Sequence, residues 1–176
     1  MQKTHIWHFR FFIIIFIGLF FGCWFTQQPE SAVNNSSVPA LLLYSGVSGV
    51  RTMKDASALW ITNRKALEDV FSALSRRQIE DGDVLLDIDF DRYGVLYLEM
   101  GQKPTGGYSI DFIPSLSRVI DKQAFISISW NTPEEGVFLT QAVTSPFILI
   151  KICRADITSI VVVDQDEQPL FELSIE

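Results

Sequence analysis

A succession of short apolar segments fills the second half of the chain, and this pattern most constrains the fold. Val, Ile, Leu and Phe cluster in these segments, and Gly, Pro, Asn and Asp separate them. Parallel strands need long crossover connections, usually helices, and the segments are too close together for these. We therefore expect mostly antiparallel strands at 84–91, 94–101, 107–113, 124–130, 146–153, 157–163 and 169–175.

One earlier segment has a helical period instead. Its apolar residues recur at the spacing of one helical face, and they are Leu67, Val70, Phe71 and Leu74. This spacing predicts a helix over 63–76, with Thr62 or Asn63 as its N-cap. Segments 41–46 and 58–62 are expected to be extended. The sequence thus predicts a β-rich α+β domain, in which one amphipathic helix covers a mostly antiparallel sheet or sandwich.

The first 25 residues differ in character from the rest of the chain. Residues 11–25 are an unbroken apolar run, and Lys3 and Arg10 precede it. A basic start followed by a short apolar run is typical of a secretory signal, whereas a spanning helix needs about 20 apolar residues. We expect residues 1–25 to be a signal or a membrane anchor, with the positive charges left inside and the remaining chain outside the cytoplasm.

The end of this leader is similar to a bacterial lipobox. Leu19-Phe20-Phe21-Gly22-Cys23 has apolar residues, then a small residue, then the cysteine that would receive lipid. This resemblance implies a lipoprotein of the cell envelope anchored through Cys23, with an uncleaved anchor as the alternative. Residues 26–39 are rich in Gln, Asn, Ser and Pro and are expected to form a flexible tether to a domain at 40–176.

Charge and histidine content exclude several classes of function. All 21 acidic residues follow Cys23, and they outnumber the basic residues there by nine. Such a body repels nucleic-acid phosphates. Both histidines, His5 and His8, lie in the leader, so the domain has no Ser-His-Asp or Cys-His arrangement and no imidazole metal site. We expect a protein that is not an enzyme, with no cofactor or metal and no nucleic-acid partner.

A cluster of aspartates at first suggests a calcium loop. Asp87, Asp89 and Asp91 have the right spacing, but Arg92 and Leu98 stand where that loop needs Gly and a bidentate Glu. We expect the three carboxylates to face water and the two apolar residues between them to face the core.

The glycine-rich segment 101–108 is the main candidate site. It has the Gly-x-x-x-x-Gly outline of a phosphate-binding loop, but Gly107 and Tyr108 occupy the positions of the essential Lys and Ser/Thr. Pro104 fixes a turn, and Gly106 and Gly107 permit positive φ, which predicts a tight loop between two strands. Such a loop is either a simple turn or a preorganised partner-binding loop. Its candidate residues are Gln102, Lys103, Pro104, Thr105, Gly106, Gly107 and Tyr108.

This loop and its surroundings resemble the C-terminal domain of the PrcB-like protease-complex subunit family. The matching strings are MGQKPTGGYSIDF, with DFDRY upstream and SPFILIKI downstream. The family motif falls on Gly101 and the loop, and then on Ser145, Pro146 and Phe147. The resemblance implies a non-catalytic, exported and often lipid-anchored domain that associates with and stabilises a protease complex.

A second resemblance gives an alternative function. Residues 103–108 are similar to the Asn-Pro-Thr-Thr-Gly-Tyr loop of chagasin-like cysteine-protease inhibitors, from which they depart at two positions. The other two loops of that inhibitor wedge have no match here. The sequence therefore favours a membrane-tethered module that binds a protein in the cell envelope. A protease inhibitor and a purely structural envelope lipoprotein are the alternatives.

Overall fold

The computed structural model describes residues 36–48, 54–74 and 87–175. The chain divides into Met1–Ala32 and a compact unit, Val33–Glu176. The predicted leader, its Cys23 and the first ten residues of the predicted tether lie outside the described residues. Within the described ranges, no helix has the length and apolar character needed to cross a membrane.

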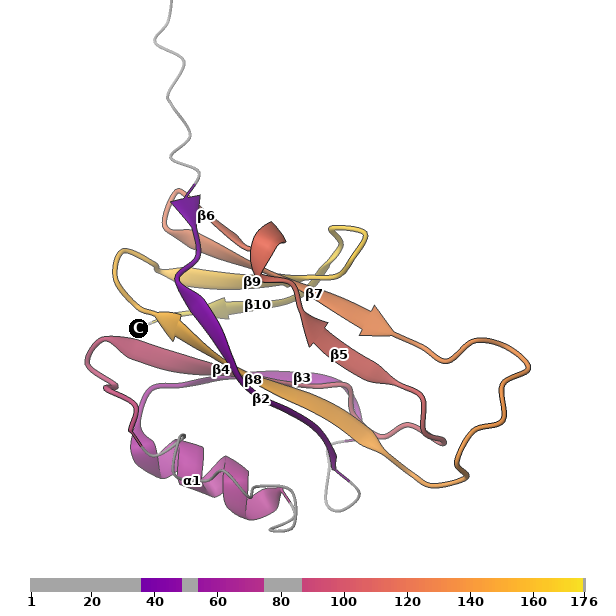
Figure 1. Cartoon of the computed structure of the whole chain (residues 1–176). Coiled ribbons are helices and arrows are strands. Elements are labelled where there is room, and N and C mark those ends of the chain that lie inside the picture. Colours follow the sequence, from indigo (N-terminus) through magenta and orange to yellow (C-terminus); the bar gives the residue numbers. More distant parts are fainter. Residues whose placement is uncertain (1–35, 49–53, 75–86, 176) are drawn as a thin grey trace, which may run out of the picture. The chain divides into compact units, whose positions relative to one another are not determined.

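Two sheets make up the described part of the compact unit (Figure 1). In the six-stranded sheet the order is β1-β6-β7-β9-β10, and β5 pairs with β7. These strands are β1 (Ser36–Ser37), β5 (Ser109–Phe112), β6 (Arg118–Ile120), β7 (Gln123–Asn131), β9 (Ser159–Val163) and β10 (Pro169–Ser174). The four-stranded sheet has the order β2-β8-β4-β3, and its strands are β2 (Ala40–Ser48), β3 (Ser57–Ile61), β4 (Tyr93–Glu99) and β8 (Ser145–Cys153).

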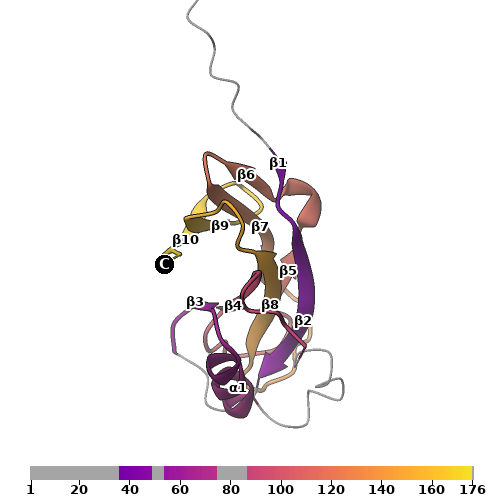
Figure 2. The same cartoon turned by 90° about the vertical axis from the view of Figure 1, so that its left-hand side faces the viewer.

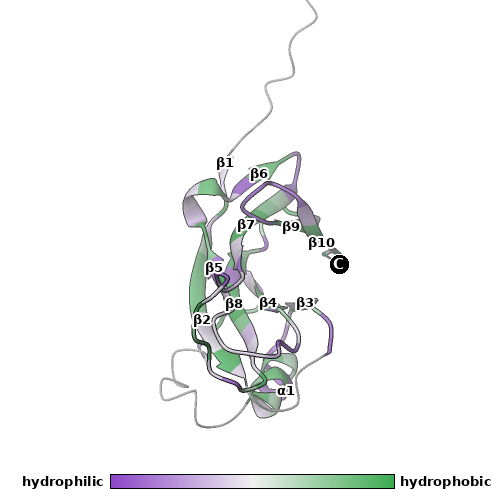
Figure 3. Cartoon of the chain, turned by 90° about the vertical axis from the view of Figure 1, so that its right-hand side faces the viewer, coloured by the Kyte–Doolittle hydropathy of each residue, from purple (hydrophilic) through white to green (hydrophobic). Residues whose placement is uncertain are grey.

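The four-stranded sheet is the middle layer, between the six-stranded sheet and helix α1 (Arg64–Ala73) (Figures 1 and 2). Alternation along β8 explains why it has two apolar faces. Ile148 and Ile150 belong to the core between the sheets, whereas Phe147 and Leu149 belong to the core beneath the helix. Figure 3 shows hydrophobic residues in the strands and hydrophilic residues in several of the turns. The expected β-rich α+β class, mostly antiparallel with one helix, is confirmed.

Helix α1 begins and packs as its sequence predicts. The Asn63 side chain accepts a hydrogen bond from the Ala66 N–H at 2.9 Å, so Asn63 is the N-cap. Leu67 is almost fully buried against the four-stranded sheet, and Val70 and Phe71 pack beside it. The helix therefore buries the predicted apolar stripe.

One pair of strands differs from the expected pairing. Strands β7 and β9 are parallel, with Gln123 opposite Ser159. The chain between them runs through β8, which belongs to the other sheet. The connection between these two parallel strands thus contains a strand of the second sheet in place of a helix. Strand spacing along the sequence does not reveal such a connection.

The predicted strand 84–91 is wrong over its described part. Residues 87–89 have no regular secondary structure and residues 90–92 form a turn. The Asp89 carbonyl accepts from the Tyr93 N–H at 2.9 Å, and the Asp89 side chain accepts from the Asp91 N–H at 3.1 Å. Aspartate favours such local bonds over a strand ladder. The predicted facing is still correct, because the three aspartates are exposed and Ile88 is buried.

The folded part begins before Ala40. Ser36 and Ser37 pair with β6, and Val38 is in the core between the sheets. The last residues assigned to the tether therefore belong to the folded unit. Strand β6 was not predicted from the sequence. It joins β7 through a two-residue turn, Asp121-Lys122, whose positive φ values are those of a type I′ hairpin.

Candidate functional site

Two loops lie at the same end of the sandwich (Figure 1). Loop A, residues 101–108, joins β4 to β5, and loop B, residues 132–144, joins β7 to β8. Loop A contains every residue predicted to bind a partner.

Hydrogen bonds, most of them between backbone groups, join the two loops to each other. Lys103 and Thr144 exchange both of their backbone bonds, with N–O distances of 2.7 and 3.0 Å. The Gly106 N–H donates to the Thr140 carbonyl at 3.0 Å, and the Thr144 hydroxyl donates to the Thr105 carbonyl at 2.7 Å. Loop A is consequently held along most of its length by loop B.

Two glycines give loop A its shape. Gly101 has φ 71° and Gly107 has φ 87°, in the left-handed region. A Cβ on Gly101 would lie 2.5 Å from the Asp55 carbonyl carbon, and one on Gly107 would lie 2.9 Å from the Leu139 side chain. Gly101 follows the end of β4 and Gly107 precedes the start of β5, which explains why both strands are shorter than predicted. Of the two glycines expected to permit positive φ, only Gly107 uses it.

Some side chains of loop A are exposed to solvent, and others pack against the domain. Gln102 and Pro104 are exposed, whereas Lys103, Thr105 and Tyr108 are half-buried. Tyr108 packs against the core between the sheets, and the Lys103 ammonium lies 5.6 Å from the centre of its ring. Loop A is thus anchored at Tyr108, and it exposes Gln102 and Pro104 to solvent.

Ser145, the first residue of the downstream motif, belongs to a buried polar network. Its hydroxyl donates to Glu99 Oε1 at 2.7 Å, and the Tyr97 hydroxyl donates to Glu99 Oε2 at 3.0 Å. Ser145 is fully buried and Glu99 is 3% exposed. Burial, reinforced by the neighbouring carboxylate, raises the pKa of Tyr97 well above its usual value. This network joins the strand end that precedes loop A to the strand start that follows loop B.

Sequence reasoning missed Glu99 and Tyr97. The available signal was a carboxylate within the apolar run from Val95 to Met100, two residues after a tyrosine and hence on the same strand face. Buried carboxylates need hydrogen-bond donors, and Tyr97 supplies one.

Pro146 and Phe147 complete the motif as structural residues. The Pro146 carbonyl accepts from the Met100 N–H at 2.9 Å. The Phe147 ring stacks on Tyr44 with centroids 5.7 Å apart and lies 6.0 Å from the Tyr97 ring. Neither residue faces solvent. The downstream motif thus supports the two loops from inside.

The motif residues thus lie in loop A and at the start of β8. A family model also matches this part of the chain. Residues 95–153 match the PrcB C-terminal family model. The match confirms the resemblance to the PrcB-like family. No curated protein and no solved structure matches the chain.

The matched segment, residues 95–153, contains most of β4, both loops, and β5, β6, β7 and β8. Strands β1, β2, β3, β9 and β10, which complete the two sheets, and helix α1 lie outside this segment. The segment therefore relies on the surrounding chain for its helix layer and for the edges of both sheets.

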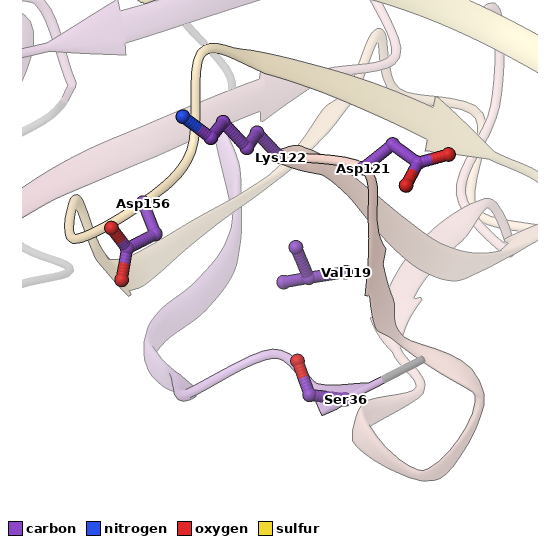
Figure 4. Close-up of a pocket in the computed structure, with 5 residues that line it drawn as sticks. All are labelled: Ser36, Val119, Asp121, Lys122 and Asp156. Atoms are coloured by element: carbon purple, nitrogen blue, oxygen red, sulfur yellow. The ribbon is translucent and has the colours of Figure 1, made fainter. Parts of the chain in front are cut away.

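A hollow beside β1 and β6 lies outside the two loops (Figure 4). Ser36, Val119, Asp121, Lys122 and Asp156 line it. Figure 4 shows the two carboxylates on opposite sides of the hollow, pointing away from each other. In the part of the chain that the structure describes, no three His, Cys, Asp or Glu side chains are grouped to hold a metal ion. Loop A, which holds the residues predicted to bind a partner, and loop B, which is hydrogen-bonded to it, form the candidate site.

Proposed function

We propose that this chain is a non-catalytic, exported protein-binding module, and that it associates with a protease complex of the cell envelope through loop A. A leader or a lipid on Cys23 tethers it to the membrane, with the domain on the non-cytoplasmic side. It requires no cofactor.

The observation that carries this proposal is the fixed conformation of loop A. Backbone bonds to Thr140 and Thr144 and the anchored Tyr108 hold the loop, while Gln102 and Pro104 remain exposed. A loop that is ordered before binding loses less conformational entropy on association. Ordered loops on rigid scaffolds commonly carry binding functions.

The family match supports a protease complex as the partner. Loop A lies inside the matched segment, and the PrcB-like family is named for a subunit of a protease complex. The acidic, histidine-free body agrees with a binding role and offers no imidazole for catalysis.

A capture experiment with the full chain tests the assignment of loop A. Thr105→Arg adds a long charged side chain to the half-buried middle of the loop, and we expect it to abolish co-purification of the partner from solubilised membranes. Ser115→Arg is the matched control. Ser115 is exposed and lines a hollow beside β1, outside loops A and B. Both variants should unfold at the temperature of the unmodified protein. Equal partner recovery with Thr105→Arg and Ser115→Arg would exclude loop A as the contact.

A further inference from the structure

Loop B presents an apolar tip to solvent. Phe138 is fully exposed at 105% of its reference area, and Val137 beside it is 53% exposed. Exposed aliphatic residues are common singly, but a fully exposed phenylalanine beside an exposed valine is a typical interface feature.

The tip is held out by the residues on either side of it. Leu139 and Pro133 lie against Gly107 of loop A, where a Cβ would approach them to 2.9 and 3.0 Å. Thr140 then accepts the backbone bond from Gly106. Phe138 therefore projects from a loop whose base is fastened on both sides, and not from a free chain end.

The charges around the tip favour one kind of partner. Glu134 and Glu135 precede it and are both exposed. The chain as a whole carries a net charge of −7. Two carboxylates beside an apolar tip are repelled by an anionic lipid surface and attracted by basic side chains. A second copy of this acidic chain is disfavoured on the same ground.

We infer that Phe138 is the anchor residue of the binding surface, and that it inserts into an apolar pocket of a partner protein whose rim carries Lys or Arg. This inference rests on the proposed function and extends its surface from loop A to loop B. Central aromatic residues that fill a partner's pocket usually dominate binding energy. The two glutamates then select the partner and accelerate encounter.

Site-specific photocrosslinking of the full chain in its own cells tests the inference. The photoreactive amino acid p-benzoylphenylalanine replaces Phe138 in one strain and Thr105 in another. We expect the position-138 probe to crosslink one protein, on a peptide that lines an apolar pocket with Lys or Arg at its edge. Crosslinks only to lipid, crosslinks to a second copy, or no crosslinks from position 138 would overturn the inference.

Comparison of crosslinks from positions 105 and 138 tests the role of Phe138 separately from the proposed function. Crosslinks from position 105 without crosslinks from position 138 would leave the proposed function standing and exclude Phe138 as the anchor. An absence of crosslinks from both positions would contradict the role of Phe138 and the proposed function alike.

The affinity for the partner, once the crosslinked protein is identified and purified, measures how much Phe138 contributes to binding. Phe138→Ala should weaken affinity by about 30-fold or more, the effect expected of an anchor. Leu116→Ala, at a residue 53% exposed on the short helix η2 (Pro114–Leu116), should change it less than twofold. A combined Glu134→Gln and Glu135→Gln variant should slow association and flatten its salt dependence. Equal affinities for Phe138→Ala and Leu116→Ala would refute the anchor role.

Discussion

Single residues of the motif act mainly from inside the domain. Ser145 and Phe147 are buried, and the Ser145 hydroxyl, like that of Tyr97, donates to the Glu99 carboxylate. A buried carboxylate is stable only while its oxygens are satisfied, so each donor matters. The motif at 145–147 therefore preserves the geometry of the loops.

Ser145→Ala tests this role. Removal of its hydroxyl leaves Glu99 Oε1 without that donor in a buried place, and we expect the free energy of unfolding to fall by about 1–3 kcal/mol. Ser45→Ala, at an exposed position of β2, should change it by less than about 0.5 kcal/mol. Urea unfolding at pH 7 measures both. Equal stabilities of the two variants would contradict the role of Ser145.

Tyr97→Phe tests the same network through pH. Because folding raises the pKa of Tyr97 above its usual 10.0, its contribution to stability is complete below pH 10 and declines as the pH rises further. Phenylalanine has no proton to lose. The unmodified protein should therefore exceed the variant in stability by about 1 kcal/mol at pH 7, and this difference should shrink by pH 11. A difference that stays constant or widens in urea unfolding would contradict the raised pKa.

At the scale of elements, local patterns in the sequence predict those helices and turns that depend on residues close together in the chain. The periodicity of Leu67 and the cap at Asn63 locate helix α1, and Pro104 with Gly107 locates loop A. Contacts between distant segments are not visible in such patterns. The bond from Gly106 to Thr140 and the projection of Phe138 depend on how two connections meet in space. The sequence therefore identifies loop A as a candidate site, and it indicates loop B only as the connection between two predicted strands.

Gly107→Ala and Gly136→Ala form a matched pair that tests the coupling of the loops. Both glycines have left-handed φ, and either substitution should cost about 1–2 kcal/mol in backbone strain. A Cβ at position 107 would meet Leu139 and Pro133 of loop B, whereas one at position 136, within loop B, would have no heavy atom within 4 Å apart from its chain neighbours. Gly107→Ala alone should therefore accelerate hydrogen exchange of the Gly106 amide, which NMR measures. Equal acceleration in both variants would contradict the coupling.

At the scale of the whole molecule, the sandwich was predictable as a class and not in its connections. Alternating apolar residues require strands with buried faces, and this requirement gives the β-rich α+β class. The parallel pairing of β7 with β9 follows from the assignment of β8 to the other sheet, which alternation does not reveal because β8 is apolar on both faces. The pairing of Ser36 and Ser37 with β6 was equally hidden, because β1 is short and polar.

The anchoring proposal is tested on the intact protein by mass spectrometry of its mature N-terminus. We expect a diacylglyceryl group on Cys23 and no residues before it, with Cys23→Ala abolishing the modification and releasing the protein from membranes. An intact leader starting at Met1 would favour the uncleaved anchor.

We propose that loops A and B form one preorganised binding surface at one end of the sandwich. Hydrogen exchange of the full chain, measured alone and with its purified crosslinked partner, tests this proposal. We predict that the partner slows exchange in residues 101–108 and 132–144 and leaves helix α1 and the edge strands β2 and β10 unchanged. Protection confined to the helix or to those edges, with both loops unaffected, would contradict the claim.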